Sequence, residues 1–398
     1  MLVLTGASVA PSVNAYPVNA TNGKVSEWSV ADESVAYVED DRLVGVAAGK
    51  TTVTATIVDT DPEGNETRYS VTFTVIVKEN TDNMYGYLVG DLANNDGTYW
   101  VELDDATTGY QGISYAYYQG MYLTIYSAEY VDGKIYAYGF NAEDWNANFL
   151  FLTIDAKTWA VTDCIDMGDG FPFVYDLAYD YTTGTMYAVA GPNDDATDLY
   201  YVNLETGKLI DCMNLEPMIM SLAIDANGTI YGMAAGAEDF DPLDWVTTYY
   251  NAMLYTLDPV NGTYELLMDT GFKCNMLSSM SYDYDTGYIY WTCLFSGTGY
   301  ESGLKLIDLE EKAVYDLGTI GGAGAQVTGL MVIADEYPDV PTNLSNIAIT
   351  TGINEVSIGG KVALEAFCQP SGLDLELTWT SADAVSYTHL TLPTMAVV

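Results

Sequence analysis

The chain has 398 residues, 49% of them hydrophobic, and is therefore long enough for two or three domains with sizeable cores. Its 34 tyrosines and 36 glycines, without long stretches of helix-forming residues, predict an all-β protein with many tight turns. A formal net charge of −44 argues against nucleic acid and anionic lipid surfaces as partners, and no apolar run approaches the roughly 18 to 20 residues that span a bilayer.

Residues 1–79 carry alternating Val and Thr around a single tryptophan. Trp28 is expected to fill a sandwich core, Asp32 to start a turn, and Gly49 to let the chain bend into the next strand. The segments that carry the pattern are 25–38, 43–56 and 71–77. They resemble the bacterial immunoglobulin-like (Ig-like) domain of group 2, which is common in bacterial surface adhesins. The resemblance covers the module except its first strand, which is missing, so we expect that Met1 is not the native start.

This resemblance implies an extracellular or bacterial cell-surface location. The start of the chain has no basic segment before its mildly apolar stretch, so it does not match a signal peptide. We therefore expect that both the signal and the anchor are absent from this fragment.

Between residues 80 and 337 one phrase recurs, an apolar strand followed by a turn with glycine and an aromatic-rich strand. Its copies are 128–138, 177–189, 222–233 and 280–291. A second phrase carries an Asp or Asn every 48 to 55 residues, at Asp104, Asp155, Asn203, Asp258 and Asp308. This spacing is the length of one four-stranded propeller blade with its loops.

The two ends of this repeat region complement each other. The first repeat has second and third strands, at 84–89 and 98–104, but no inner strand, whereas the last has an inner-strand candidate at 327–333 and nothing after it. Joining them forms a fifth blade and removes free sheet edges. The prediction is thus an all-β chain, a five-bladed β-propeller with flanking Ig-like β-sandwich modules. The blades resemble quinoprotein-like or NHL-like repeats, a resemblance of fold that implies no activity.

The inner strands are expected to carry one acid among five equivalent positions. These are Ser127, Asp176, Ser221, Ser279 and either Thr328 or Gly329. A glycosidase requires two carboxylates within roughly 5 to 10 Å of each other, and a Ser/His or Cys/His pair is impossible because residues 81–337 contain no His. We therefore expect no enzyme and no catalytic residues. A carboxylate-dependent glycoside hydrolase, or another hydrolase, that uses Asp176 is the alternative.

The loops between second and third strands should gather on one face with the blade-to-blade connections. Aromatic side chains beside carboxylates and amides suit stacking on sugars and hydrogen bonds to their hydroxyls. The candidate ligand-binding residues are the loop residues Trp145, Trp245, Tyr249 and Tyr300 and the inner-strand residues Asp176, Ser127, Ser221 and Ser279. The alternative is that these loops are merely solvated and that one Trp covers a blade edge.

The longest loop also offers a candidate metal site. Asp239, Asp241 and Asp244 could chelate Ca²⁺ through hard oxygen ligands, although the spacing is not that of an EF-hand and Asp-rich turns are frequent in this chain. We expect no cofactor, with Ca²⁺ as the alternative. The five cysteines lack metal-binding spacing, and we expect free, packed thiols, with some disulfide as the alternative.

Residues 338–385 repeat the beginning of the N-terminal pattern, with Trp379 and Asp383 spaced like Trp28 and Asp32. They resemble a truncated second Ig-like domain of group 2. Residues 386–398 resemble translated sequencing-adapter read-through, so we expect a non-native tail.

These patterns predict a non-catalytic bacterial surface protein. Its propeller loop face would bind a glycan or a surface protein, and the Ig-like modules would serve as spacers or adhesion modules. A purely structural spacer is a further alternative. We expect a monomer that neither binds nucleic acid nor inserts into a membrane.

Overall fold

The computed structural model describes residues 1–13, 25–61, 63–144, 147–193, 196–236, 250–274, 278–295, 301–344, 346–349, 366–370 and 378. All the regular elements of this part of the chain are strands, and none of its residues forms a helix long and apolar enough to cross a membrane.

Two sheets form the N-terminal module. The first has the order β1 (Leu2–Leu4), β7 (Glu66–Lys78), β6 (Gly49–Thr60) and β3 (Glu27–Val30), and the second has β2 (Ser8–Val9), β5 (Arg42–Gly45) and β4 (Ala36–Glu39). Their facing side chains form one apolar core that includes Val3, Leu43, Val53 and Val75. Residues 2–9, which lie outside the segments that carry the Ig-like pattern, thus contribute a strand to each sheet.

Two of the predicted roles in this module can be followed in detail. Trp28 is only half-buried: its ring packs against the edge of the core, and its Nε1 donates a hydrogen bond to Asp41 Oδ1 at 3.0 Å. Asp32 does begin a turn, since its Oδ1 accepts hydrogen bonds from the backbone and the side chain of Ser34.

Five sheets follow in the chain between Met84 and Val332, and each is an antiparallel succession of strands from the inside outward. The first is β28 (Gln326–Val332), β8 (Met84–Gly90), β9 (Tyr99–Leu103) and β10 (Tyr110–Ser114). The second is β12 (Met121–Val131), β13 (Lys134–Asn141), β14 (Leu150–Asp155) and β15 (Val161–Asp166), with the short β11 (Tyr117–Tyr118) beside β12. The third is β16 (Phe173–Asp180), β17 (Thr185–Asn193), β18 (Ala196–Val202) and β19 (Leu209–Asn214). The fourth is β20 (Ile219–Ile224), β21 (Ile230–Gly236), β22 (Tyr250–Asp258) and β23 (Thr263–Cys274), and the fifth is β24 (Ser279–Tyr282), β25 (Ile289–Phe295), β26 (Glu301–Asp308) and β27 (Ala313–Thr319).

The inner strands close into a ring, which confirms the predicted propeller. β28 contacts β12, and contacts continue through β16, β20 and β24 back to β28. The closing blade pairs the two ends of the repeat region, with Gln326 opposite Gly90 and Val332 opposite Met84. We number the blades one to five in the order of the sheets given above.

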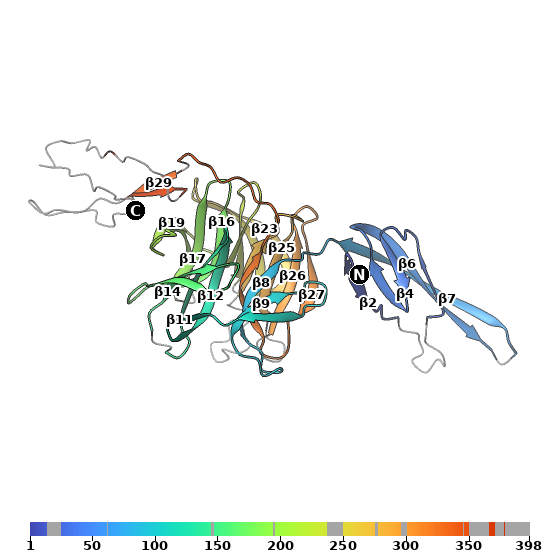
Figure 1. The fold of residues 1–398 in the computed structure, drawn as a ribbon. Helices are drawn as coiled ribbons and strands as arrows, with labels where there is room; N and C mark the ends of the chain where they lie inside the picture. Colours follow the sequence, from blue (N-terminus) through green and yellow to red (C-terminus); the bar gives the residue numbers. More distant parts are fainter. Residues whose placement is uncertain are drawn as a thin grey trace, which may run out of the picture.

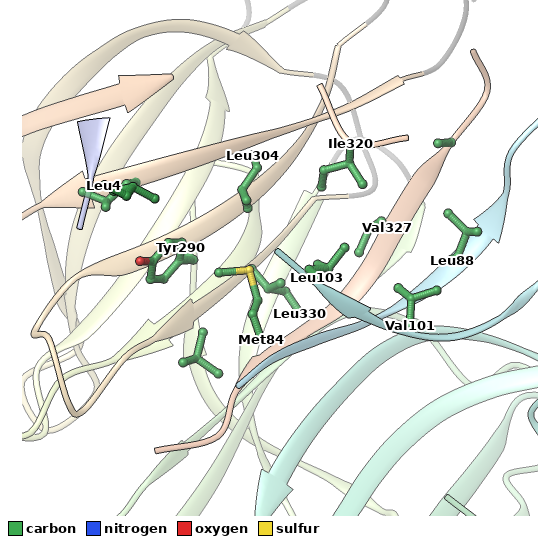
Figure 2. Close-up of a cluster of buried hydrophobic side chains, with 13 residues drawn as sticks. Leu4, Met84, Leu88, Val101, Leu103, Tyr290, Leu304, Ile320, Val327 and Leu330 are labelled. Atoms are coloured by element: carbon green, nitrogen blue, oxygen red, sulfur yellow. The ribbon is translucent and has the colours of Figure 1, made fainter. Parts of the chain in front are cut away.

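Apolar side chains fill the space between neighbouring blades. Figure 2 shows the cluster between blades one and five, where Met84 and Val327 of the closing blade meet Tyr290 and Leu304 of blade five. Leu4 of the N-terminal module also belongs to this cluster, so the module packs directly on the propeller. In Figure 1 the module lies beside β27, and β29 lies at the opposite side of the propeller.

Little of the predicted second Ig-like module is described. After residues 338–344, the structure gives a pair of strands, β29 (Asn346–Ile349) and β30 (Ala366–Gln369), with Phe367 buried near Tyr201 of blade three. Residues 386–398, the predicted tail, lie wholly outside the described residues. The five cysteines are free thiols in this structure.

Candidate functional site

The sequence-predicted site residues fall into two groups, of which the structure describes one. Ser127, Asp176, Ser221 and Ser279 occupy corresponding places on the inner strands, and none of them has any exposed surface. The predicted loop residues Trp145, Trp245, Tyr249 and Tyr300, and the candidate Ca²⁺ ligands Asp239, Asp241 and Asp244, lie outside the described residues.

Two of these buried residues, Asp176 and Ser279, accept hydrogen bonds from backbone groups of neighbouring inner strands. An inner strand has a hydrogen-bonded neighbour on one side only, and N–H groups on its other edge need an acceptor when they are buried. Leu330 N donates to Ser279 Oγ at 2.9 Å, and Val332 N donates to Ser281 Oγ at 2.9 Å. Two serine side chains of blade five thus accept hydrogen bonds from the N–H groups on the inner edge of the closing blade.

Asp176 performs this role for two other strands. Its Oδ2 accepts hydrogen bonds from Leu222 N of β20 and Met280 N of β24, each at 3.0 Å, and its Oδ1 accepts one from Ser279 Oγ at 2.9 Å. Burial raises the pKa of Asp176 to about 8. Since both oxygens already have protein donors, these contacts favour the interpretation of Asp176 as a hydrogen-bonding residue over direct ligand contact.

A second carboxyl group lies near Asp176. Glu129 follows Ser127 by two residues on β12, and its Oε1 accepts a hydrogen bond from Tyr130 N at 2.8 Å. Burial raises the pKa of Glu129, and the charge of Asp176 raises it further. Ser127 Oγ is buried and has no hydrogen-bond partner among the described residues.

The recurrent Asp and Asn of the sequence repeat form the turns between third and fourth strands. One side-chain oxygen in each turn accepts backbone N–H groups two or three residues ahead, at Asp104, Asp155, Asn203, Asp258 and Asp308. These are Asx-type turns, and they belong to the end of each blade opposite the loop face. Part of the strongly acidic composition is therefore structural.

The described part of the loop face carries a group of exposed tyrosines that the sequence analysis did not single out. Tyr115, Tyr117 and Tyr122 are 58%, 49% and 49% exposed, although large aromatic side chains are usually well buried. Tyr122 contacts Tyr117 with ring centroids 5.2 Å apart and Tyr115 at 6.1 Å, and Tyr99 contacts Tyr115 at 5.7 Å. We call Tyr115, Tyr117 and Tyr122 the tyrosine cluster.

An extra element presents this cluster. The connection between blades one and two forms β11, which pairs with the start of β12 through Tyr117 opposite Tyr122. Figure 1 shows β11 at the lower end of the propeller, whereas the chain that leads to β29 runs along the upper end. The signal in the sequence was the tyrosine-rich run 114–118 in a blade-to-blade connection, which already belonged to the expected loop face.

The neighbouring loop of blade one is held by internal hydrogen bonds. The buried Asp91 accepts hydrogen bonds from Asn94, from Tyr110 Oη at 2.9 Å, and from Gly322 N at 2.9 Å. Burial alone would raise the pKa of Asp91, but the hydrogen bonds from Asn94 and Gly322 outweigh it and hold the pKa below its usual value. These hydrogen bonds fix the conformation of the blade-one loop.

Among the residues that the structure describes, no group of three or more His, Cys, Asp or Glu side chains is placed to hold a metal ion. The Ca²⁺ prediction concerns Asp239, Asp241 and Asp244, which are not among them.

Together, these features define a modular all-β protein in which a propeller is joined to an Ig-like sandwich. Residues 1–65 match the model of the bacterial Ig-like domain (group 2). No curated protein matches the chain.

Several solved structures are distantly similar. An auxiliary nutrient binding protein from Bacteroides ovatus is 14% identical with a TM-score of 0.34, and the match covers 83% of this chain and 71% of that protein. A putative 6-phosphogluconolactonase from Bacteroides uniformis is 11% identical with a TM-score of 0.31, over 60% of this chain and 83% of that one. The GH43B protein of a Bacteroides ovatus xyloglucan locus is 13% identical with a TM-score of 0.30, over 75% of this chain and 56% of that one. These likenesses are too distant to assign an activity.

Proposed function

We propose that this chain is part of a non-catalytic protein of the bacterial cell surface whose propeller loop face binds a glycan. The Ig-like modules act as spacers, and a surface protein is the alternative ligand. The observation that carries the proposal is the tyrosine cluster, which stands exposed at the loop face.

Three exposed tyrosines, of which Tyr122 contacts the other two, offer flat apolar faces together with hydroxyl groups. Such rings can stack on the C–H faces of sugars, and their hydroxyls can bond to sugar hydroxyls. The contacts between the rings restrict their motion, so less conformational entropy is lost when a ligand binds. The net charge of −44 disfavours an anionic ligand, and we therefore propose a neutral glycan.

The chain enters and leaves the ring of blades at the end opposite the loop face. The N-terminal module enters the propeller at Met84, which lies opposite Val332, the end of β28 from which the chain leaves toward β29. Both connections are therefore at the turn end of the closing blade. The loop end of the same blade is marked by Gln326 opposite Gly90. A spacer joined to the turn end would present the loop face outward.

The match of residues 1–65 to a bacterial Ig-like domain supports the bacterial surface location. We also propose that the blades are of the quinoprotein-like or NHL-like type. This likeness concerns the fold alone and implies no activity. A hydrolase that depends on Asp176 is the alternative class. Because that carboxyl is fully buried, it has no surface with which to contact a substrate, and this favours the binding function over hydrolysis.

The experiment is a glycan array with the full chain, followed by calorimetric titration of the best neutral glycan. Tyr117→Ala and Tyr122→Ala should each weaken binding by about tenfold or more, the equivalent of one lost stacking contact. Tyr69→Ala, which removes an exposed tyrosine of the N-terminal module, is the matched control and should bind as the wild type does.

Absence of binding to every neutral glycan, or unchanged affinity in both cluster variants, would overturn the proposal. A broad hydrolase screen with the wild type and Asp176→Asn separates the enzymatic alternative. Turnover that is lost in this variant would establish it.

A further inference from the structure

A polar cleft separates the N-terminal module from blade one of the propeller. Its volume is about 830 Å³, and three segments line it: residues 5–8 with Arg42 from the module, residues 80–82 from the connecting chain, and residues 102–107 and 109–111 from blade one. Ligand sites commonly measure about 300 to 1,000 Å³ and often lie between domains. The cleft is distinct from the loop face.

Hydrogen bonds hold residues of two walls in place: Thr5 is bonded within the module to the end of β7, and the connecting chain is bonded to blade one. Thr5 of the module donates from its N and its Oγ1 to the carbonyl oxygen of Lys78, at 2.8 and 3.1 Å. Thr81 N of the connecting chain donates to Asp105 Oδ2 of blade one at 3.1 Å, and Tyr290 Oη donates to the same oxygen at 2.8 Å. The cleft is therefore preorganised, which lowers the entropic cost of binding.

The lining provides both donors and acceptors. Arg42 is exposed, and Ser8 accepts only two of the five N–H donors of its guanidinium group, through Nε at 2.9 Å and Nη2 at 2.6 Å. The amides of Asn80 and Gln111 can both donate and accept, whereas the carboxylates of Glu102 and Asp82 only accept. Gln111 and Glu102 are cross-strand partners on β10 and β9, so an amide and a carboxylate lie side by side.

A ligand that suits this mixture must itself both donate and accept hydrogen bonds. A sugar hydroxyl does so, since it can donate to Glu102 or Asp82 and accept from Arg42 or Gln111. A Lys-rich peptide would leave Arg42 facing a like charge, and an anionic ligand would face the carboxylates. We propose that this cleft is a second binding site, for a neutral oligosaccharide, independent of the loop face.

The test titrates the full chain with a panel of neutral di- to tetrasaccharides, using saturation-transfer NMR and calorimetry. Glu102→Gln and Arg42→Ala should each weaken binding at least about tenfold. Their matched controls are Glu265→Gln on the exposed outer strand of blade four and Arg68→Ala on β7, and both should leave the affinity unchanged. Because Arg42→Ala also removes hydrogen bonds to Ser8, Gln111→Ala provides a third cleft variant without that structural effect.

A loop-face variant separates this site from the proposed function. Binding at the cleft should persist in Tyr117→Ala, whereas binding at the loop face should persist in Glu102→Gln. The proposal of a cleft site fails if no neutral saccharide binds, or if every saccharide that binds does so equally well in all three cleft variants. It also fails if a Lys-rich peptide or a uronic-acid oligosaccharide occupies the cleft in preference to the neutral panel.

Discussion

The side chain of Asp176 links neighbouring inner strands of the propeller. The serines at the corresponding positions make shorter connections: Ser279 Oγ accepts from Leu330 N and donates to Asp176 Oδ1, and Ser221 Oγ pairs with Ser278 Oγ at 3.2 Å. The longer carboxylate of Asp176 reaches the backbone of two further blades, and so one residue holds three of the five inner strands together.

Two substitutions of Asp176 should separate the contribution of its hydrogen bonds to stability from the contribution of its charge. Asp176→Ala leaves two buried N–H groups without an acceptor, and each costs about 1 to 3 kcal/mol, so the free energy of unfolding should fall by about 3 to 5 kcal/mol. Asp176→Asn keeps an oxygen for both groups and should cost less than about 1 kcal/mol. Urea denaturation measures both, and equal losses in the two variants would contradict the hydrogen-bonding role.

The same carboxyl should make stability depend on pH in an unusual direction. Burial raises the pKa of Asp176 to about 8 from its ordinary value of 3.8, so between these values the folded protein holds a proton that the unfolded chain releases. Stability therefore falls as the pH rises through this window. Asp105, whose pKa burial raises to about 6, adds to the lower part of the window.

We expect the free energy of unfolding of the wild type to decrease from pH 5 to pH 8, and Asp176→Asn to show a smaller decrease. Urea midpoints at pH 5, 6, 7 and 8 provide the measurement. Parallel curves for the two proteins would show that Asp176 ionises in the folded state as it does in the unfolded chain.

At the scale of single elements, the closing blade depends on a close approach between β8 and β28. A Cβ atom at Gly86 would lie 2.6 Å from Cγ1 of Val327, whereas a Cβ atom at Gly90 on the same strand would meet no heavy atom within 4 Å. The two glycines therefore provide a matched pair for testing how the propeller closes.

Gly86→Ala should destabilise the protein by about 1 to 3 kcal/mol, since the added methyl group forces Val327 out of its position. Gly90→Ala should change the free energy of unfolding by no more than about 0.5 kcal/mol. Thermal and urea denaturation compare them directly. If Gly86→Ala were as harmless as Gly90→Ala, the pairing of β8 with β28 would lose its support.

At the scale of the whole molecule, one buried lysine joins the N-terminal module to the propeller. Lys78 Nζ lies 2.5 Å from Asp308 Oδ2 and 3.3 Å from Glu311 Oε2, and it faces the rings of Tyr288 and Tyr315 at 5.6 and 5.7 Å. Burial alone would lower the pKa of Lys78, but the hydrogen bond and the charge of Asp308 raise it overall. The side chain thus remains charged within the interface.

Lys78→Ala should cost about 3 to 5 kcal/mol, because it leaves Asp308 buried without its counter-charge. Lys50→Ala removes an exposed ion pair to the same Glu311 and should cost no more than about 1 kcal/mol. Urea denaturation gives the energies, and limited proteolysis of the connection 79–83 reports whether the module has loosened. Equal protease sensitivity in the two variants would show that Lys78 does not hold the junction.

The architecture could be predicted from local patterns. Strands and turns produce periodic residue patterns in the sequence. The roughly fifty-residue spacing between successive Asp or Asn positions, from Asp104 to Asp308, indicated the blade length. The closing blade followed from what the first and last repeats lacked, and the pairing of Val332 with Met84 confirms it. The N-terminal sandwich was likewise recognisable from short motifs around Trp28 and Gly49.

The contacts that define the candidate sites could not be predicted in this way. Asp176 bonds to residues 46 and 104 positions away, and Lys78 bonds to one 230 positions away. Arg42 and Glu102 line the same cleft only because the N-terminal module packs beside blade one. The exposure of Tyr117 and Tyr122 likewise depends on how β11 packs at the loop face. Local sequence determines the strands and turns because their hydrogen bonds and side-chain alternation are local, whereas burial, exposure and polar partners arise only when distant segments pack together.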